Sequence, residues 1–518
     1  MAGILLLLAA AWPFRQAWIA GALPGAGPDV VSTVWGMWWF QQSWTGAAWG
    51  ELSPLVNAPN GAYGSVLSPS SALLFAISEP LLGIARAACL AALLQVAGLA
   101  FGVVWLARRL GLSSLASWAA GFFTLVGRYL IYDTGEGSLV AIAALPLPIG
   151  LGLLTKRGWG PALAGGACIM WAALENPYLA LILPVAAGVS WLRDRRLPLA
   201  VGTVLGCLGT LGISRLFARS ANPNYPNARA GEWYRLGPWR IEIVDMPWAR
   251  ASLRELFWPT ELSWTVDAST GVDASGGLYL GWSLLILAAV GGALTWRRSW
   301  PWILACLAAL LLALGSFPGG PFVVLNGLMD AFLRPLTQPT RFLVLASIGL
   351  SVLAATGLEQ TGQRLGPKAL ILIVFVAVDA FVLGGMSLRP PSQALPSSDC
   401  VTGLEGGVLI WPLDGRMDDP SLARMLQMHH QQPAPQRGIA SWRLNGEDVH
   451  RSLQLHGFSD DPKFGTLTWK PIQELGYQNL VVLPSGPKIP IALPTAQCQT
   501  PDLAVYRIAD LPDEPVIR

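Results

Sequence analysis

Long apolar runs separated by short polar connections dominate the first three quarters of this chain. Eleven of the runs approach the roughly 20 residues that a helix needs to cross a bilayer. They are residues 4–20, 88–107, 115–130, 139–154, 161–173, 178–192, 199–217, 278–296, 302–315, 342–358 and 369–385. The pattern predicts a mainly α fold, a polytopic transmembrane bundle of about 11 helices within residues 1–387.

Polar character rises after residue 388. Residues 407–413 and 479–483 are short runs rich in β-formers, and residues 419–432 have a helical composition. These features predict a C-terminal α/β domain over residues 388–518. Two further stretches, residues 21–87 and 218–276, are expected to be long outer loops of the membrane domain.

Composition agrees with a membrane protein. Hydrophobic residues make up 53% of the 518 positions and charged residues 13%, about half the charged fraction of soluble domains. The 24 Trp suit a bilayer interface, where an apolar ring and an N–H donor are both satisfied. The net charge of +3 and the lack of a dense basic run argue against nucleic acid as a partner.

Positive residues recur in alternate connections between the apolar runs. These residues are Arg108, Arg109, Lys156, Arg157, Arg193, Arg195, Arg196, Arg297, Arg298, Arg364 and Lys368. The positive-inside rule assigns such connections to the cytoplasm. We therefore expect an integral protein of the bacterial inner membrane, with its N-terminus inside and its C-terminal domain outside. For the first run, interrupted by Pro13 and Arg15, a cleaved signal peptide is the alternative.

Most carboxylates map to the outer side, and all four His lie in the C-terminal region. Asp29 follows the first run within the turn-forming stretch Leu23-Pro-Gly-Ala-Gly-Pro-Asp29. Trp35, Trp38 and Trp39 come next, at a spacing that gives them one helix face. This spacing predicts a helix in the outer membrane interface, with Asp29 either placed at headgroup depth or serving as its N-cap.

Two outer connections carry further acids. Asp133 and Glu136 are close enough in sequence to share a divalent cation such as Mg or Mn, with solvated loop carboxylates as the alternative. Glu175 lies in the next outer turn. Arg128, Arg215 and Arg341 map to the same side, where Arg either binds phosphate or snorkels to headgroups.

Two expectations concern pairing. Asp379 lies inside the last apolar run, where an unpaired charge is costly, so it is expected to pair with an Arg or a hydroxyl in the bundle interior. Cys400 and Cys498 bracket the C-terminal domain. Because an exported domain meets an oxidising compartment, we predict a disulfide between them.

The arrangement resembles the GT-C class of membrane glycosyltransferases, which use polyprenyl-phosphate-linked sugars. The resemblance is carried by one span, a long outer loop that starts with an acid, many further spans and an outer C-terminal domain. The local strings that carry it are the stretch ending at Asp29, Asn57-Ala-Pro-Asn-Gly61, and Arg341 after Pro339. Many members have a second acid beside the first, whereas Val30 follows here.

The resemblance implies a transferase that moves a sugar from a polyprenyl-phosphate donor to an unknown outer acceptor. Asp29 would be the catalytic carboxylate that acts on the acceptor. Substrate binding would involve the Arg side chains and neighbouring groups, namely Arg128, Arg215, Arg341, Glu175, Trp35 and Trp38. A divalent cation would be held by Asp133 and Glu136. The alternative is a non-catalytic scaffold, or a lipid-binding or transport protein of the same fold.

Overall fold

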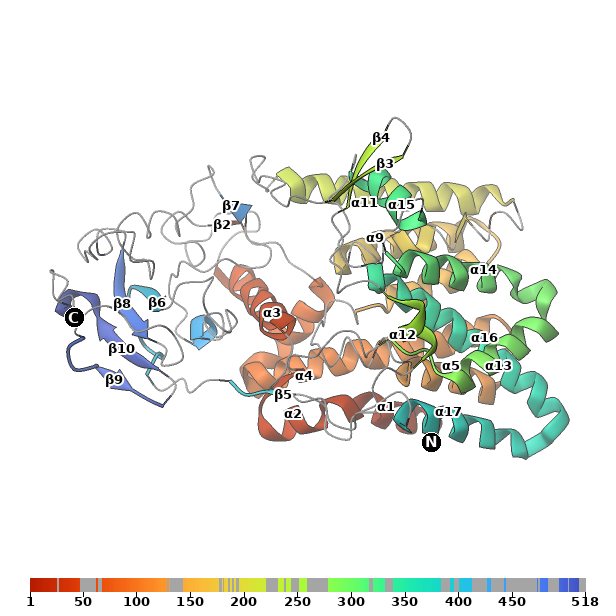
Figure 1. Ribbon diagram of the computed structural model, residues 1–518, viewed down its shortest axis with the longest axis horizontal. Helices are drawn as coiled ribbons and strands as arrows, with labels where there is room; N and C mark the ends of the chain where they lie inside the picture. The colour runs from red at the N-terminus through yellow and green to blue at the C-terminus, as the bar shows by residue number, and fades with distance from the viewer. Residues whose placement is uncertain are drawn as a thin grey trace.

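The computed structural model shows a bundle of helices with a small sheet beyond one end of it (Figure 1). The bundle is formed by the N-terminal three quarters of the chain, and the sheet by C-terminal segments. The structure describes residues 1–25, 28–46, 62–63, 68–127, 130, 143–176, 179, 181–184, 187–188, 191, 195–219, 232–236, 239–243, 251–258, 278–315, 320–330, 339–382, 392–395, 400–411, 426–429, 442–443, 473, 476–482, 493–501 and 503–511.

The first span is helical through its proline. It comprises α1 (Ala2–Ala11), a 3₁₀ turn η1 (Trp12–Phe14) and α2 (Arg15–Ala20). Pro13 is the second residue of the 3₁₀ turn, where its missing N–H costs little. Arg15 donates to the Trp12 carbonyl oxygen at 2.6 Å and lies over the Trp12 ring, so its charge is satisfied locally. Gly21 ends α2 in the left-handed conformation that glycine adopts without strain.

The second long helix begins well before the apolar run that predicted it. After β1 (Leu23–Pro24) and α3 (Pro28–Gly46), helix α4 (Pro69–Arg109) covers 41 residues. Its axis is broken at Gly83, whose φ of 73° and ψ of 167° are not helical. A side chain at Gly83 would be strained. Helix therefore occupies part of residues 21–87, which the sequence assigned to a loop.

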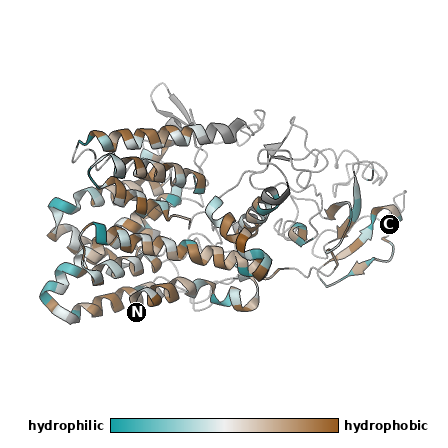
Figure 2. Ribbon diagram, turned by 180° about the vertical axis from the view of Figure 1, so that it is seen from behind, coloured by the Kyte–Doolittle hydropathy of each residue, from teal (hydrophilic) through white to brown (hydrophobic). Residues whose placement is uncertain are grey.

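Most of the other helices follow predicted apolar runs. The other helices are α5 (Ser114–Leu125), α8 (Pro146–Leu154), α9 (Trp159–Glu175), α11 (Leu197–Arg219), α12 (Leu253–Phe257), α13 (Trp282–Leu294), α14 (Trp296–Ala313), α15 (Pro321–Asp330), η4 (Pro339–Phe342), α16 (Leu343–Leu365), η5 (Gly366–Ala369) and α17 (Leu370–Val382). Two of them do not follow a run: α12 lies in the stretch 218–276 that was expected to be a loop, and α15 lies between two runs. Figure 2 shows hydrophobic residues along these helices and hydrophilic residues at the turns farthest from the C-terminal sheet. This distribution is the one expected of a bundle whose ends meet water.

Small residues let two helix pairs approach closely. Gly166 of α9 faces Gly202 and Gly206 of α11, and a Cβ built at Gly206 would lie 2.6 Å from the Gly166 carbonyl oxygen. Gly291 of α13 and Gly357 of α16 meet in the same way. Such contacts suit helices in lipid, where close van der Waals packing supplies much of the association.

Among the described residues, three helical segments are long and apolar enough to cross a membrane: 2–20, Pro69–Arg109 and Pro339–Leu365. Shorter apolar helices occur at Ser114–Leu125, 197–212, Trp282–Leu294 and 370–380. The membrane-protein character predicted from the apolar runs is thus present. The number of eleven spans stays a prediction, because several of the runs fall partly outside the described ranges.

The C-terminal part contains a four-stranded sheet in the order β6-β8-β10-β9. Strands β6 (Gly407–Trp411) and β8 (Tyr477–Val482) are parallel, whereas β10 (Ala504–Arg507) runs antiparallel to β8 and to β9 (Cys498–Gln499). A 3₁₀ turn η6 (Ile508–Asp510) follows β10. A separate apolar core fills this part, made of Cys400, Val401, Val408, Ile410, Leu426, Val481, Leu503 and Val505.

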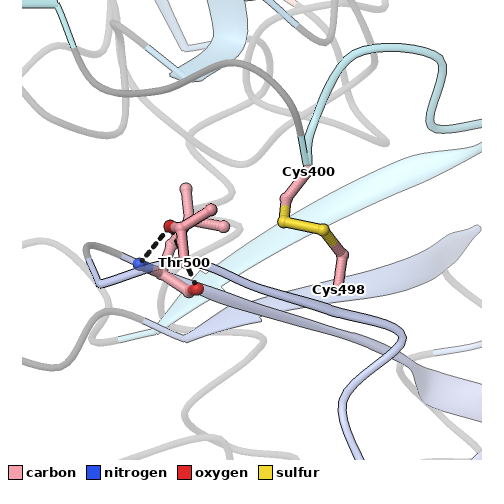
Figure 3. Close-up of a disulfide and its surroundings, with 4 residues drawn as sticks. Cys400, Cys498 and Thr500 are labelled. Atoms are coloured by element: carbon pink, nitrogen blue, oxygen red, sulfur yellow. Dashed lines mark hydrogen bonds between the residues drawn. A yellow bond between two sulfur atoms is a disulfide. The ribbon is translucent and has the colours of Figure 1, made fainter.

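Cys400 and Cys498 form the disulfide that the sequence predicts, with their Cα atoms 5.5 Å apart (Figure 3). The bond joins residues 98 positions apart and ties β9 to the turn before β6. Thr500 follows β9, and its hydroxyl accepts a hydrogen bond from the Leu503 N–H at 3.2 Å. The crosslink and this turn hold the outer strand to the sheet.

Short strand pairs connect distant parts of the chain. Strand β1 pairs with β5 (Ser392–Gln393), so the end of the first span meets the segment that leaves the bundle. Strand β2 (Ala62–Tyr63) pairs with β7 (Trp442–Arg443) of the C-terminal part. A third pair is a hairpin of β3 (Glu232–Leu236) and β4 (Trp239–Ile243). The first two pairs join the first loop to the C-terminal part, at the bundle end nearer the sheet (Figure 1).

Candidate functional site

The candidate site begins at helix α3, which starts at Pro28. Proline is favoured at a first helical position because its missing N–H would be unpaired there anyway. Asp29 therefore occupies the first turn of α3 and not the capping position before it. A carboxylate in a first turn lies at the positive end of the helix dipole. The Asp29 side chain lies outside the described part of the structure.

The Trp face of α3 is turned into the protein. Trp35, Trp38 and Trp39 are 4%, 2% and 5% exposed. The Trp35 and Trp39 rings are stacked with centroids 5.9 Å apart and planes within 3°. The spacing correctly places the three rings on one face, and protein covers that face. The location of α3 at the outer membrane interface stays a prediction.

A residue of the C-terminal part contributes to this cover. The Trp35 Nε1–H donates to Gln427 Oε1 at 2.9 Å, and Gln427 is fully buried. Leu426 and Met428 beside it are buried as well. The contact spans 392 positions of sequence. Sequence reasoning missed Gln427, because an isolated Gln in a stretch of helical composition carries no signal of its partner.

Glu175 is a buried carboxylate that anchors the start of α4. It is 1% exposed and accepts from the Ser68 hydroxyl at 2.7 Å, the Ser70 backbone N–H at 3.2 Å and Trp171 Nε1–H at 2.9 Å. The free N–H groups at the start of a helix favour a negative charge there. Gln95 extends the network by donating to the Ser70 hydroxyl at 2.6 Å.

A second contact joins α3 to α4. The Gln41 side-chain amide donates to Glu79 Oε2 at 2.9 Å, one turn before the break at Gly83. Glu79 links α4 to α3 through Gln41, and Glu175 links the start of α4 to α9 through Ser70. These bonds fix the helix that follows the first loop against α3 and α9.

The remaining site candidates are not brought together by the described part. Arg341 lies in η4, where it opens α16 as predicted, and it is partly exposed. Arg215 lies in the last turns of α11, and its side chain is outside the described residues. Arg128, Asp133 and Glu136 also fall outside them. The described residues contain no group of three or more His, Cys, Asp or Glu placed to hold a metal.

Asp379 of α17 has the hydroxyl partners that the sequence allowed. Tyr279 donates its hydroxyl to Asp379 Oδ1 at 3.0 Å, and Ser283 donates both its backbone N–H, at 2.7 Å, and its hydroxyl to Oδ2. Ser283 belongs to the first turn of α13. Asp379 is only 8% exposed, so these three donors replace the water that burial removes.

Comparison with solved structures identifies the fold. The apo crystal structure of ArnT from Cupriavidus metallidurans aligns with 98% of this chain and 97% of its own, at 12% identity and a TM-score of 0.51. The chain has the GT-C fold. Arabinofuranosyltransferase AftD from Mycobacteria aligns with 99% of this chain at 15% identity and a TM-score of 0.52. The alignment spans about 40% of the AftD chain.

The likeness is structural and not visible at the level of sequence. No protein-family model matches the chain, and no curated protein matches it. A second crystal structure of the same ArnT, bound to undecaprenyl phosphate, aligns with 98% of both chains at 13% identity and a TM-score of 0.48. The resemblance that the sequence suggested is confirmed for the fold of the GT-C class by the apo ArnT structure and by AftD.

Proposed function

We propose that this protein is a membrane glycosyltransferase that transfers a sugar from a polyprenyl-phosphate-linked donor to an acceptor outside the cytoplasm. The observation that carries the proposal is the GT-C fold shared with ArnT over nearly the whole of both chains. ArnT also binds undecaprenyl phosphate, and AftD is an arabinofuranosyltransferase. In this proposal the protein lies in the bacterial inner membrane, with the C-terminal part on the outer side.

Asp29 is the proposed catalytic base. It takes the proton of an acceptor hydroxyl while the hydroxyl oxygen forms a bond to the anomeric carbon of the sugar. The bond from that carbon to the phosphate oxygen breaks, and its electrons stay on the departing lipid phosphate. Support for this role comes from the position of Asp29 in the first turn of α3, directly after the first span, which matches the GT-C arrangement.

Stabilisation of the departing phosphate needs a cation or donors that are in place before the reaction. Arg341 is the proposed group, with Arg128 and Arg215 as further candidates and Glu175, Trp35 and Trp38 as residues that shape the substrate site. Arg341 lies in η4, directly before α16, and is partly exposed. The divalent cation predicted for Asp133 and Glu136 is retained as part of the proposal, and no step is assigned to it.

A transfer assay tests the proposal. Wild-type protein in lipid nanodiscs is supplied with radiolabelled undecaprenyl-phosphate-linked pentoses and hexoses together with bacterial cell-envelope extract. We expect labelled envelope product and free undecaprenyl phosphate from at least one donor. Asp29→Asn removes the base, so the rate is expected to fall about 10²- to 10⁴-fold. Loss of the charge from the helix terminus costs only about 0.3–1 kcal/mol of stability.

The matched control is Asp510→Asn, which removes an exposed carboxylate from the C-terminal part. It should retain full activity. Full transfer by Asp29→Asn would eliminate the catalytic role of this residue. Binding of the donors by wild-type protein without transfer to any acceptor would instead favour the lipid-binding alternative.

A further inference from the structure

Four basic connections of the bundle line one cavity. The cavity has a volume of about 630 Å³ and is lined by Arg109 at the end of α4, Lys156 after α8, Arg196 before α11 and Arg298 in the first turn of α14. We call it the basic cavity. The α13–α14 and α16–α17 turns mark this end of the bundle, which is the end farthest from the C-terminal sheet (Figure 1). The basic cavity is therefore remote from the site proposed for sugar transfer.

The positive charge of the basic cavity is not neutralised by its own wall. Glu359 is the one carboxylate among its described lining residues. Both Glu359 oxygens accept from the Ser113 backbone N–H, at 3.2 and 3.3 Å, where Ser113 caps α5. That carboxylate is thus engaged by a helix terminus. The four cations and one acid leave a net positive lining, which attracts an anion.

Arg196 differs from Lys156 and Arg298 because its guanidinium binds backbone carbonyl groups of the cavity wall. Its guanidinium donates to the backbone carbonyl oxygens of Leu154, Thr155 and Lys156, at the end of α8 and just after it. A guanidinium at a helix C-terminus satisfies carbonyls that have no partner within the helix. Arg196 therefore fixes the wall of the cavity, whereas Lys156 and Arg298 are exposed and can meet a ligand.

The basic cavity is also lined with apolar side chains, including Leu151, Leu353 and Trp302. A second hollow of about 400 Å³ adjoins it and shares Lys156 and Arg196. A cationic rim over an apolar wall suits an amphipathic ligand that carries a phosphate. The volume of the basic cavity lies in the range of sites that hold whole small molecules, and the cavity is much larger than a phosphate ion.

We propose that the basic cavity binds the headgroup of an anionic phospholipid, with Lys156 and Arg298 contacting the phosphate and the acyl chains against the apolar wall. Positive residues that only set membrane orientation need to lie at this face, but they need not converge on one cavity. Arg forms charge-assisted, often bidentate bonds to phosphate oxygens. The inference does not depend on the proposed transferase activity.

Lipid binding is measured by native mass spectrometry of the full-length protein, titrated separately with phosphatidylglycerol, phosphatidylcholine or inorganic phosphate. We expect the wild-type protein to retain phosphatidylglycerol in preference to phosphatidylcholine. Arg298→Gln should weaken phosphatidylglycerol retention about tenfold, because charge-assisted bonds to the phosphate are lost. Lys156→Gln should weaken it in the same direction.

Arg297→Gln is the matched control. Arg297 is the neighbour of Arg298 on α14, is also exposed and is not among the residues that line the cavity. It should bind phosphatidylglycerol as the wild type does. Equal retention by all four proteins would overturn the proposal. Binding of inorganic phosphate without any preference for phosphatidylglycerol would also overturn it, by assigning the cavity to a soluble phosphate compound.

Discussion

The two buried carboxylates among the described residues each accept hydrogen bonds from the start of a neighbouring helix. Glu175 accepts from the Ser70 N–H at the beginning of α4, and Asp379 accepts from the Ser283 N–H at the beginning of α13. In both cases the free N–H groups of a helix terminus and one or more hydroxyls replace hydration water. The position of Asp379 inside an apolar run predicted its burial and a partner that is either an Arg or a hydroxyl, and the structure shows hydroxyls. The sequence did not identify Tyr279 and Ser283, because the pairing depends on how α13 and α17 pack.

His429 gives a pH prediction at the residue scale. Burial lowers the pKa of His429 below its ordinary value of 6.5, and its Nε2 is buried without a hydrogen-bond partner in the described part of the chain. The unfolded chain therefore binds a proton at a higher pH than the folded chain does. The contribution of His429 to the stability of the C-terminal part is fully present above about pH 6.5, and it is lost as the pH drops through the lowered folded-state pKa.

This prediction is checked by thermal unfolding of the protein at about pH 7.5 and about pH 5. The unfolding temperature of the wild type should decrease more on acidification than that of His429→Leu, which cannot take up this proton. The other three His are present in both proteins and cancel in the comparison. An identical pH response in the two proteins would contradict the role of His429.

At the scale of elements, the sequence predicted helix positions better than their surroundings. The i, i+3, i+4 spacing of Trp35, Trp38 and Trp39 placed them correctly on one face of α3. Nothing in that spacing reveals what covers the face, because Trp is equally suited to headgroups and to a protein interior with a hydrogen-bond acceptor. The acceptor is Gln427, which lies hundreds of residues away in the sequence.

The contact between α9 and α11 gives a prediction for one element pair. A Cβ at Gly202 would collide with the backbone of Ala162, whereas a Cβ at Gly212 on the same helix meets nothing within 4 Å. Gly202→Ala is therefore expected to push the helices apart and cost about 1–3 kcal/mol. Gly212→Ala should be neutral or stabilise α11 by up to about 1 kcal/mol. Unfolding in detergent, by heat or by denaturant, measures the stability of both variants. Equal stability of the two would show that the close contact between α9 and α11 is unimportant.

At the scale of the whole molecule, the sequence predicted the separation of a helical bundle from a C-terminal part with strands. Charge patterning went further: four of the basic connections it grouped together do line one cavity. The disulfide was predicted because Cys400 and Cys498 bracket a domain that is expected in an oxidising compartment. The joins between the two parts did not follow, because the β1–β5 and β2–β7 pairs involve two residues per strand. Strands of that length leave no periodic signal.

Membrane orientation is the remaining whole-molecule prediction. Because four basic connections share one cavity, a single measurement at this face assigns the side of all of them. Arg157→Cys should be shielded from an impermeant thiol reagent in intact cells, and it should react after the membrane is permeabilised. Asp510→Cys, in the exposed turn after β10, should react in intact cells. Cys207 is the partly exposed one of the four free cysteines, so Cys207→Ala provides the background for both variants.

The reverse labelling pattern would place the basic cavity outside and the C-terminal part in the cytoplasm. Asp29, in the first turn of α3, would then lie on the cytoplasmic side together with the strand pairs that join the first loop to the C-terminal part. An acceptor outside the cytoplasm could not reach it, and the disulfide between Cys400 and Cys498 would face a reducing compartment. The orientation experiment therefore tests the common premise of the transferase proposal and of the exported domain. The anionic-lipid proposal would survive reversal, because its two binding cations would still meet a phospholipid leaflet.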